Sequence, residues 1–177
     1  MKNIFLLDAK YNKDADRTVF SLLDKLSVDE REQDRGSYYG SLSGLVRHIL
    51  GGTLFFEGLF KTALPGNAGA LKALAAVEGL SAPKEKLTED QWKSLGAAIT
   101  TADDALINFI NALSEEDFQA PVKIGWYGGN PEAVPLYYML RQFSAHGTHH
   151  RGQISQILDS LKIDNDYSGI NVALLSQ

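Results

Sequence analysis

Apolar residues recur at the spacing of one helix face in four separate stretches of this 177-residue chain. Projected at about 100° per position, the apolar stripes cover roughly residues 13–26, 42–61, 88–113 and 135–161. Such stripes must be buried against other helices, and packing around one shared core is the natural solution. The sequence therefore predicts an all-α fold, a four-helix bundle that forms a single domain over residues 1–177.

The segments between these stretches carry turn signals rather than long stripes. Residues 27–37 predict a connection whose mixed charges, densest over residues 29–35, are solvated. Residues 69–83 are rich in Ala, Leu and Gly and predict short helical turns. Residues 114–135 predict a turn-rich loop with a short hairpin, and the tail after Asp164 predicts loop with one turn.

Composition and charge narrow the class of protein. With 44% apolar and 22% charged residues, the chain matches an ordinary globular protein. The lack of cysteine excludes disulfides, thiolate metal sites and a thiol nucleophile in the protein. A net charge of −5 without a basic patch argues against a nucleic-acid partner. The chain has no apolar stretch of about 18 residues, and the run Ile4–Leu7 is too short for a signal peptide. We therefore expect a cytoplasmic protein with no membrane partner.

Three of the four histidines fall within five residues: His146, His149 and His150. Histidines one turn apart on a helix lie close enough to hold one ion, but spacing alone does not distinguish the pair 146/150 from 146/149. Projected against the apolar stripe of the fourth helix, His150 falls inside the stripe, His146 at its edge, and His149 is turned away. Gly147 lies in the stripe itself, where a missing side chain leaves space beside the site.

The remaining histidine, His48, lies at the margin of the apolar stripe of the second helix. Three imidazoles around one divalent ion, with open positions, are typical of a catalytic site rather than of a closed structural one. Imidazole suits nickel, zinc and iron, so the identity of the metal stays open. On spacing alone, hydrogen-bonded histidines at the margin of the core are an equal alternative to a metal site.

Several segments resemble a known family. They are residues 41–50 on the second helix, the motif H-x-x-x-H-R-G-Q at residues 146–153, the opening pair at residues 11–12, and residues 34–37. On these segments the chain resembles the DinB family, the DinB/YfiT-like metalloenzymes, over nearly its whole length. The motif at residues 146–153 is the most specific of them.

The resemblance implies an up-down-down-up four-helix bundle, often a homodimer, that holds one divalent metal ion. Carried over to this chain, the ligands are His48, His146 and His150, the same residues that the projection turns inward. One departure is Ala145, where the family often has Asn just before the first histidine of the pair.

Three further side chains are candidates for lining a pocket: Asn12, Asp103 and His149. Asn12, on the inward side of the first helix, either lines the mouth of the site or caps that helix. Asp103 projects into the stripe of the third helix, where an unpaired carboxylate is costly. It therefore either meets Arg151 or the metal, or lies exposed where the stripe borders a groove. Arg151 projects to the other margin of its helix and predicts a bridge to an acid on a neighbouring helix.

Two functions are compatible with these features. The first is a metal-dependent enzyme that acts on a small molecule by hydrolysis or by thiol-dependent transfer, and the family resemblance favours it. Because the chain has no cysteine, a low-molecular-weight thiol would have to arrive as a cosubstrate. The second is a non-catalytic stress-response or binding protein that the ion stabilises. Trp126 and Tyr127 would cover the pocket, form a dimer contact or pack on the end of the bundle.

Overall fold

The computed structural model describes residues 1–125 and 132–176. Most of these residues are helical, as predicted for an all-α fold. The α-helices are α1 (Lys2–Leu23), α2 (Val28–Glu32), α3 (Leu42–Ala63), α4 (Ala68–Leu74), α5 (Glu89–Ala112) and α6 (Leu136–Ser160). Short 3-10 turns cover Ala75–Val77, Asp117–Gln119 and Val172–Ser176. Trp126 and Tyr127 lie outside the described residues, so their roles stay predictions.

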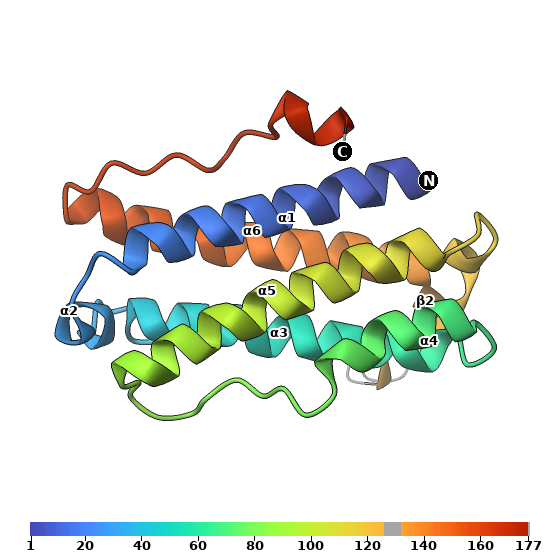
Figure 1. Ribbon diagram of the computed structural model, residues 1–177, viewed down its shortest axis with the longest axis horizontal. Coiled ribbons are helices and arrows are strands. Elements are labelled where there is room, and N and C mark those ends of the chain that lie inside the picture. The colour runs from blue at the N-terminus through green and yellow to red at the C-terminus, as the bar shows by residue number, and fades with distance from the viewer. Residues whose placement is uncertain (126–131, 177) are drawn as a thin grey trace.

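Four long helices lie side by side and give the molecule its elongated shape (Figure 1). α1 packs against α5 and α6, and α3 packs against the same two helices. Figure 1 shows α3 and α5 running in one direction and α1 and α6 in the other. This arrangement places residues from the second and fourth predicted helices, α3 and α6, next to each other.

The connections follow the predictions in most places. α4 and the following 3-10 turn occupy the segment for which short helical turns were expected. The expected hairpin is formed by β1 (Pro121–Lys123) and β2 (Ala133–Pro135), which pair antiparallel with Val122 opposite Val134. The C-terminal segment runs back along α1 and α6 (Figure 1) and ends in the last 3-10 turn. None of the helices in the described ranges has the length and hydropathy needed to cross a lipid bilayer.

The first helix is longer than its apolar stripe predicts. α1 begins at Lys2, whereas the stripe predicts a start near Lys13. The reason is that the buried face of α1 is not apolar throughout, because Asn12 and Asp16 occupy it between Ala9 and Val19. A search for apolar periodicity ends where these polar residues begin, although the helix continues through them.

The prediction of a solvated connection at residues 27–37 was wrong in part. The segment contains α2, which Ser27 and Glu30 begin with a reciprocal capping box. Arg31 of this helix is only 1% exposed. Its guanidinium lies 4.5 Å from the centre of the Trp92 ring and forms an ion pair with Glu89. The buried cation thus ties the loop to the start of α5 and is not part of a solvated face.

The core consists of two apolar clusters with polar side chains between them. One cluster surrounds Phe60 and Phe109, and the other surrounds Leu45 and Trp92. The buried polar residues between them on the four long helices are Asn12, Asp16, Thr53, Glu57, Asp103, His150 and Arg151. Buried polar groups are costly unless they are hydrogen-bonded or ligated. This polar layer is therefore the part of the core in which a functional site is expected.

Candidate metal centre

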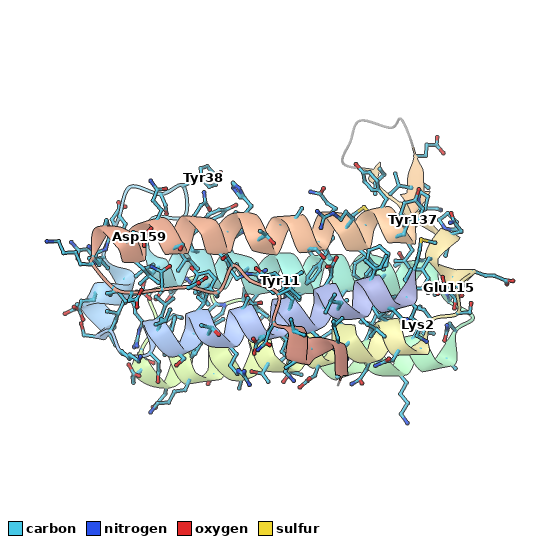
Figure 2. The ribbon with its side chains drawn as sticks, turned by 90° about the horizontal axis from the view of Figure 1, so that it is seen from above. Lys2, Tyr11, Tyr38, Glu115, Tyr137 and Asp159 are labelled. Carbon is cyan, nitrogen blue, oxygen red and sulfur yellow. The ribbon has the colours of Figure 1, made fainter. Side chains whose placement is uncertain are left out.

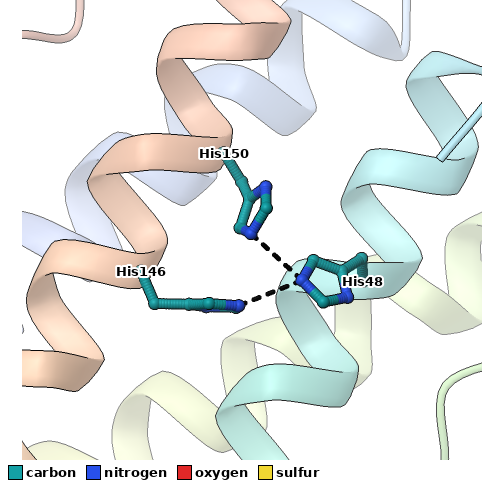
Figure 3. A group of neighbouring side chains, drawn as sticks. All are labelled: His48, His146 and His150. Atoms are coloured by element: carbon teal, nitrogen blue, oxygen red, sulfur yellow. Dashed lines mark hydrogen bonds between the residues drawn. The ribbon is translucent and has the colours of Figure 1, made fainter. Parts of the chain in front are cut away.

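His48 of α3 meets His146 and His150 of α6 at the edge of this polar layer (Figure 3). The Nε2 atom of His48 lies 3.0 Å from Nε2 of His146 and 3.0 Å from Nε2 of His150. The three ligand nitrogens lie within 4.8 Å of one another. Among the described residues, no other group of three or more His, Asp or Glu side chains is arranged so closely. The structure thus brings together the three histidines that the sequence singles out.

Local packing holds two of the three rings in place. An ideal Cβ on Gly52 would lie 2.4 Å from Cε1 of His146, so only glycine leaves room for this ring on the facing helix. Tyr39 stacks on the His48 ring with their centres 3.9 Å apart and their planes 18° from parallel. The close approach of α3 and α6 at Gly52 therefore places the His146 ring.

The third ring is oriented by a hydrogen bond within α6. Nδ1 of His150 lies 2.7 Å from Oε1 of Gln153, three residues further along the helix. Since an amide oxygen only accepts, Nδ1 of His150 donates and carries the proton. The lone pair of His150 is then on Nε2, which faces the other two rings. This is the arrangement by which proteins orient histidine ligands of metals.

The three rings cannot satisfy one another by hydrogen bonds alone. Nε2 of His150 is an acceptor, so the proton in its contact with His48 must come from Nε2 of His48. That nitrogen then has no lone pair for His146 and only one proton for two contacts of 3.0 Å, so at most one of them is a full hydrogen bond. A cation between the three lone pairs satisfies all of them at once. The cluster therefore fits a metal ion better than a hydrogen-bonded core.

The electrostatics of the cluster keep its rings neutral. Burial, followed by the neighbouring histidines, lowers the pKa of His48 and of His146 to about 4. Burial also lowers the pKa of His150, against the opposing effect of the Gln153 hydrogen bond. Neutral imidazole is the form that binds metals. The site is thus prepared for a cation near neutral pH.

His149 does not belong to the cluster. It is exposed, and its ring lies at 75° to that of His150, with the ring centres 4.8 Å apart. The projection along α6 had turned this residue away from the stripe that holds His150. As a pocket candidate, His149 lies on the solvent side of the site.

The other two pocket candidates, Asn12 and Asp103, join a buried network behind the histidines. Nη1 of Arg151 donates to Oδ1 of Asn12 at 2.7 Å and to Oδ1 of Asp16 at 2.8 Å. Nδ2 of Asn12 donates to Oδ2 of Asp16 at 3.1 Å and to Oδ1 of Asp103 at 2.9 Å. The predicted bridge from Arg151 to an acid on a neighbouring helix is present, and its partner is Asp16 of α1.

This network corrects three expectations. Asn12 sits in the middle of α1 and does not cap it. Asp103 is buried rather than exposed, and its hydrogen-bond partner is Asn12 rather than Arg151. The space at Gly147 is filled, because an ideal Cβ there would lie 2.8 Å from Oδ1 of Asn12 and 3.0 Å from Nη1 of Arg151. Asp16 was not singled out from the sequence, although it lies one turn after Asn12 on the same face. That spacing was the signal that could have revealed it.

Comparison with known families identifies the chain. The model of the DinB family matches residues 1–161 of the 177. The chain belongs to the DinB family. Comparisons with curated proteins and with solved structures find no significant match. The three-histidine cluster is what a metal-dependent DinB protein would use, and the matched region contains all three residues and the network behind them.

Proposed function

We propose that this DinB-family protein is a metal-dependent enzyme that acts on a small molecule by hydrolysis or by thiol-dependent transfer. One observation carries the proposal, the convergence of the Nε2 atoms of His48, His146 and His150 on one point. We assign these three residues as the ligands of one divalent ion. The donor set does not select among nickel, zinc and iron, and the two Nε2 separations of 3.0 Å from His48 are compatible with coordination by imidazole at about 2.0–2.1 Å.

The donor set and its surroundings favour an open site. Three protein ligands leave at least one position of a four-coordinate ion for another molecule. The His48 and His146 side chains are half-exposed, and only His150 is buried. A bound ion would supply Lewis acidity at this point. The chain itself would supply the orientation: Gln153 fixes His150, Tyr39 backs His48, and the glycine at position 52 admits His146.

The reacting partner must come from outside the chain. With no cysteine in the sequence, a transferred or attacking sulfur would belong to a low-molecular-weight thiol. Tyr38 lies in the loop that precedes α3, is 92% exposed and contacts the Tyr39 ring (Figure 2). Tyr38 therefore lies next in sequence to the residue whose ring stacks on His48. Asn12, Asp103 and His149 are not among the assigned ligands, and we propose that His149 borders the entrance.

The overall topology, the oligomeric state and the location are also part of this proposal. The directions of α1, α3, α5 and α6 support an up-down-down-up four-helix bundle. The homodimer and the cytoplasmic location are carried over from the sequence, and both stay predictions. Nucleic acid and membrane are not expected as partners.

A second function has one observation in its favour. The three ligands come from two helices, so an ion would cross-link α3 to α6 and stabilise the fold without any reaction. This describes a metal-stabilised stress-response or binding protein. The two proposals differ in whether the ion exchanges its outer ligands.

Elemental analysis of wild-type protein purified without chelators tests the metal, and the proposal expects about one ion per chain. Cobalt substitution tests the open position. Azide or 2-mercaptoethanol should change the visible spectrum of the cobalt protein if a position faces solvent. An unchanged spectrum would support the structural role. Screens with low-molecular-weight thiols and small electrophiles then address the reaction.

A further inference from the structure

A cavity of about 450 Å³ lies between α1 and α5, away from the histidines. This volume is within the range of about 300–1,000 Å³ that is usual for small-molecule sites. None of the three clustered histidines lines it. Its inner wall is formed by one carboxylate from each helix, Asp16 and Asp103. We asked what this second site is built to hold.

The cavity exists because α5 presents small side chains to α1. Gly96 is required where the helices touch, since an ideal Cβ there would lie 2.6 Å from Cζ of Phe20. Phe20 in turn stacks on Trp92, with ring centres 4.4 Å apart, and is thereby held as an apolar wall. Ala97, the next residue, and Thr100, one turn after Gly96, leave the adjacent space open. The pocket is therefore shaped by fixed groups.

One oxygen on the inner wall has no partner. Asp103 is only 3% exposed, and its single hydrogen bond joins its Oδ1 to Nδ2 of Asn12 at 2.9 Å. Within the described part of the chain, Oδ2 of Asp103 accepts no hydrogen bond. Asp16, in contrast, is fully engaged by Arg151 and Asn12. On the inner wall, the carboxylate with an oxygen open to a ligand is thus that of Asp103.

The inner wall also carries more acid than base. The guanidinium of Arg151 is the cation beside these two acids, and of the two it forms an ion pair with Asp16 only. Burial, followed by the charge of Asp16, raises the pKa of Asp103 well above its usual range. Glu57 adds a smaller effect in the same direction. A second cation at the open oxygen would offset this cost.

Among the described residues that line the cavity, no cation forms an ion pair with Asp103. Lys13 and Arg17 line the cavity, but they form ion pairs with Asp104 and Asp14. Lys93 lies ten residues before Asp103, which is about 15 Å along the helix axis. The open oxygen of Asp103 is therefore available to a cationic ligand.

We propose that this cavity binds a small organic ammonium ion, with its charged group against Asp103 and Asp16 and its apolar part along Phe20 and Ile99. The ammonium donates to Oδ2 of Asp103, and three donors allow it to contact both carboxylates. The site is independent of the proposed metal-dependent function, because it uses none of the metal ligands.

The test uses metal-loaded protein and hexylammonium as the probe, with hexanol and hexanoate as neutral and anionic probes of the same length. Backbone amide chemical shifts locate the binding, and their titration gives the affinity. The proposal expects hexylammonium to shift amides of residues 96–103 and to bind about tenfold or more tightly than hexanol. Asp103→Asn keeps the acceptor for Asn12 and should weaken the binding of hexylammonium by a similar factor.

Two further variants guard against a folding artefact. Ala97→Leu fills the cavity from an exposed helix position without touching the acids, and it should abolish the shifts. Ser94→Leu makes the same kind of change on α5 outside the cavity and should leave binding intact. Hexanoate or hexanol binding as tightly as hexylammonium, or unchanged affinity in Asp103→Asn or Ala97→Leu, would overturn the proposal. Shifts confined to the surroundings of the histidines would overturn it as well.

Discussion

Gly52 of α3 and His146 of α6 are in direct contact across the helix interface, and an ideal Cβ at residue 52 would lie 2.4 Å from Cε1 of His146. A distance this short requires the imidazole ring to move. The absence of a side chain at one residue therefore decides where a metal ligand from a distant part of the chain can lie.

Gly52→Ala should displace His146 and weaken metal binding by about tenfold or more, the range seen when the support of a ligand is lost. Competition with a chromophoric chelator measures the affinity. The matched control is Gly58→Ala on the same helix, because nothing lies within 4 Å of its ideal Cβ. This control should keep full affinity and gain up to about 1 kcal/mol of stability from helix propensity. Equal effects of the two substitutions would contradict the steric argument.

His150→Ala should remove most of the bound metal, since it deletes the ligand that Gln153 holds in place. His149→Ala should retain most of it, because His149 is exposed and outside the cluster. Elemental analysis of both variants, purified side by side without chelators, gives the metal content per chain. Similar losses in both would show that the two adjacent residues are interchangeable, against the geometry.

Gln153→Ala should lower metal affinity by about tenfold or more, although it replaces none of the three ligand residues. The physical reason is that Nδ1 of His150 loses the acceptor that fixes its tautomer and orientation. Chelator competition again measures the change. Gln142→Ala, at a half-buried position of the same helix, is the control and should bind metal like the wild type. A loss confined to Gln142→Ala, or shared by both, would refute the role of this hydrogen bond.

Glu57 should make the protein less stable as pH rises. It is 1% exposed, both of its oxygens lack hydrogen-bond partners in the described structure, and burial raises its pKa to about 8. An acid whose pKa is higher in the folded state binds its proton more tightly there. The free energy of unfolding therefore falls between about pH 4.5 and pH 8 and then levels off, by at most about 5 kcal/mol from this group.

Glu57→Gln should remove this dependence and be more stable than the wild type at pH 9, but not at pH 5. Urea denaturation at both values, with a chelator present in all samples, measures the difference. Part of the fall in stability will remain, because the pKa of Asp103 is shifted in the same direction. A variant that is less stable than the wild type at pH 9 would indicate that Glu57 has a partner when ionised.

The predictable part of the site follows from local helix geometry. Each residue of a helix turns by about 100°, so the positions of His146, His149 and His150 around α6 were determined as soon as the apolar stripe was known. The same rule located most of α3, α5 and α6, since their buried faces are largely apolar. It failed at the start of α1, where Asn12 and Asp16 interrupt the pattern although they are buried.

The polar layer shows what local geometry does not contain. In the sequence, a buried Asp103 or Arg31 cannot be distinguished from an exposed one. Burial of such a charged side chain is tolerated only where a partner offsets the loss of hydration, and the partner lies elsewhere in the chain. For Arg31 the partners are Glu89 and the Trp92 ring, and for Asp103 the partner is Asn12. These contacts join residues that are 58 to 91 positions apart.

By itself, the sequence determined most of the extent of α3, α5 and α6, the face on which each histidine lies and the family to which the chain belongs, because helix period and motif spacing are properties of neighbouring residues. Tertiary structure alone decided that His48 lies 3.0 Å from two histidines that follow it by 98 and 102 residues. It also decided that Arg151 of α6 forms an ion pair with an acid of α1. The physical reason is that these contacts depend on which helices pack together and at what depth. That packing is set by the whole core, including small residues such as Gly52.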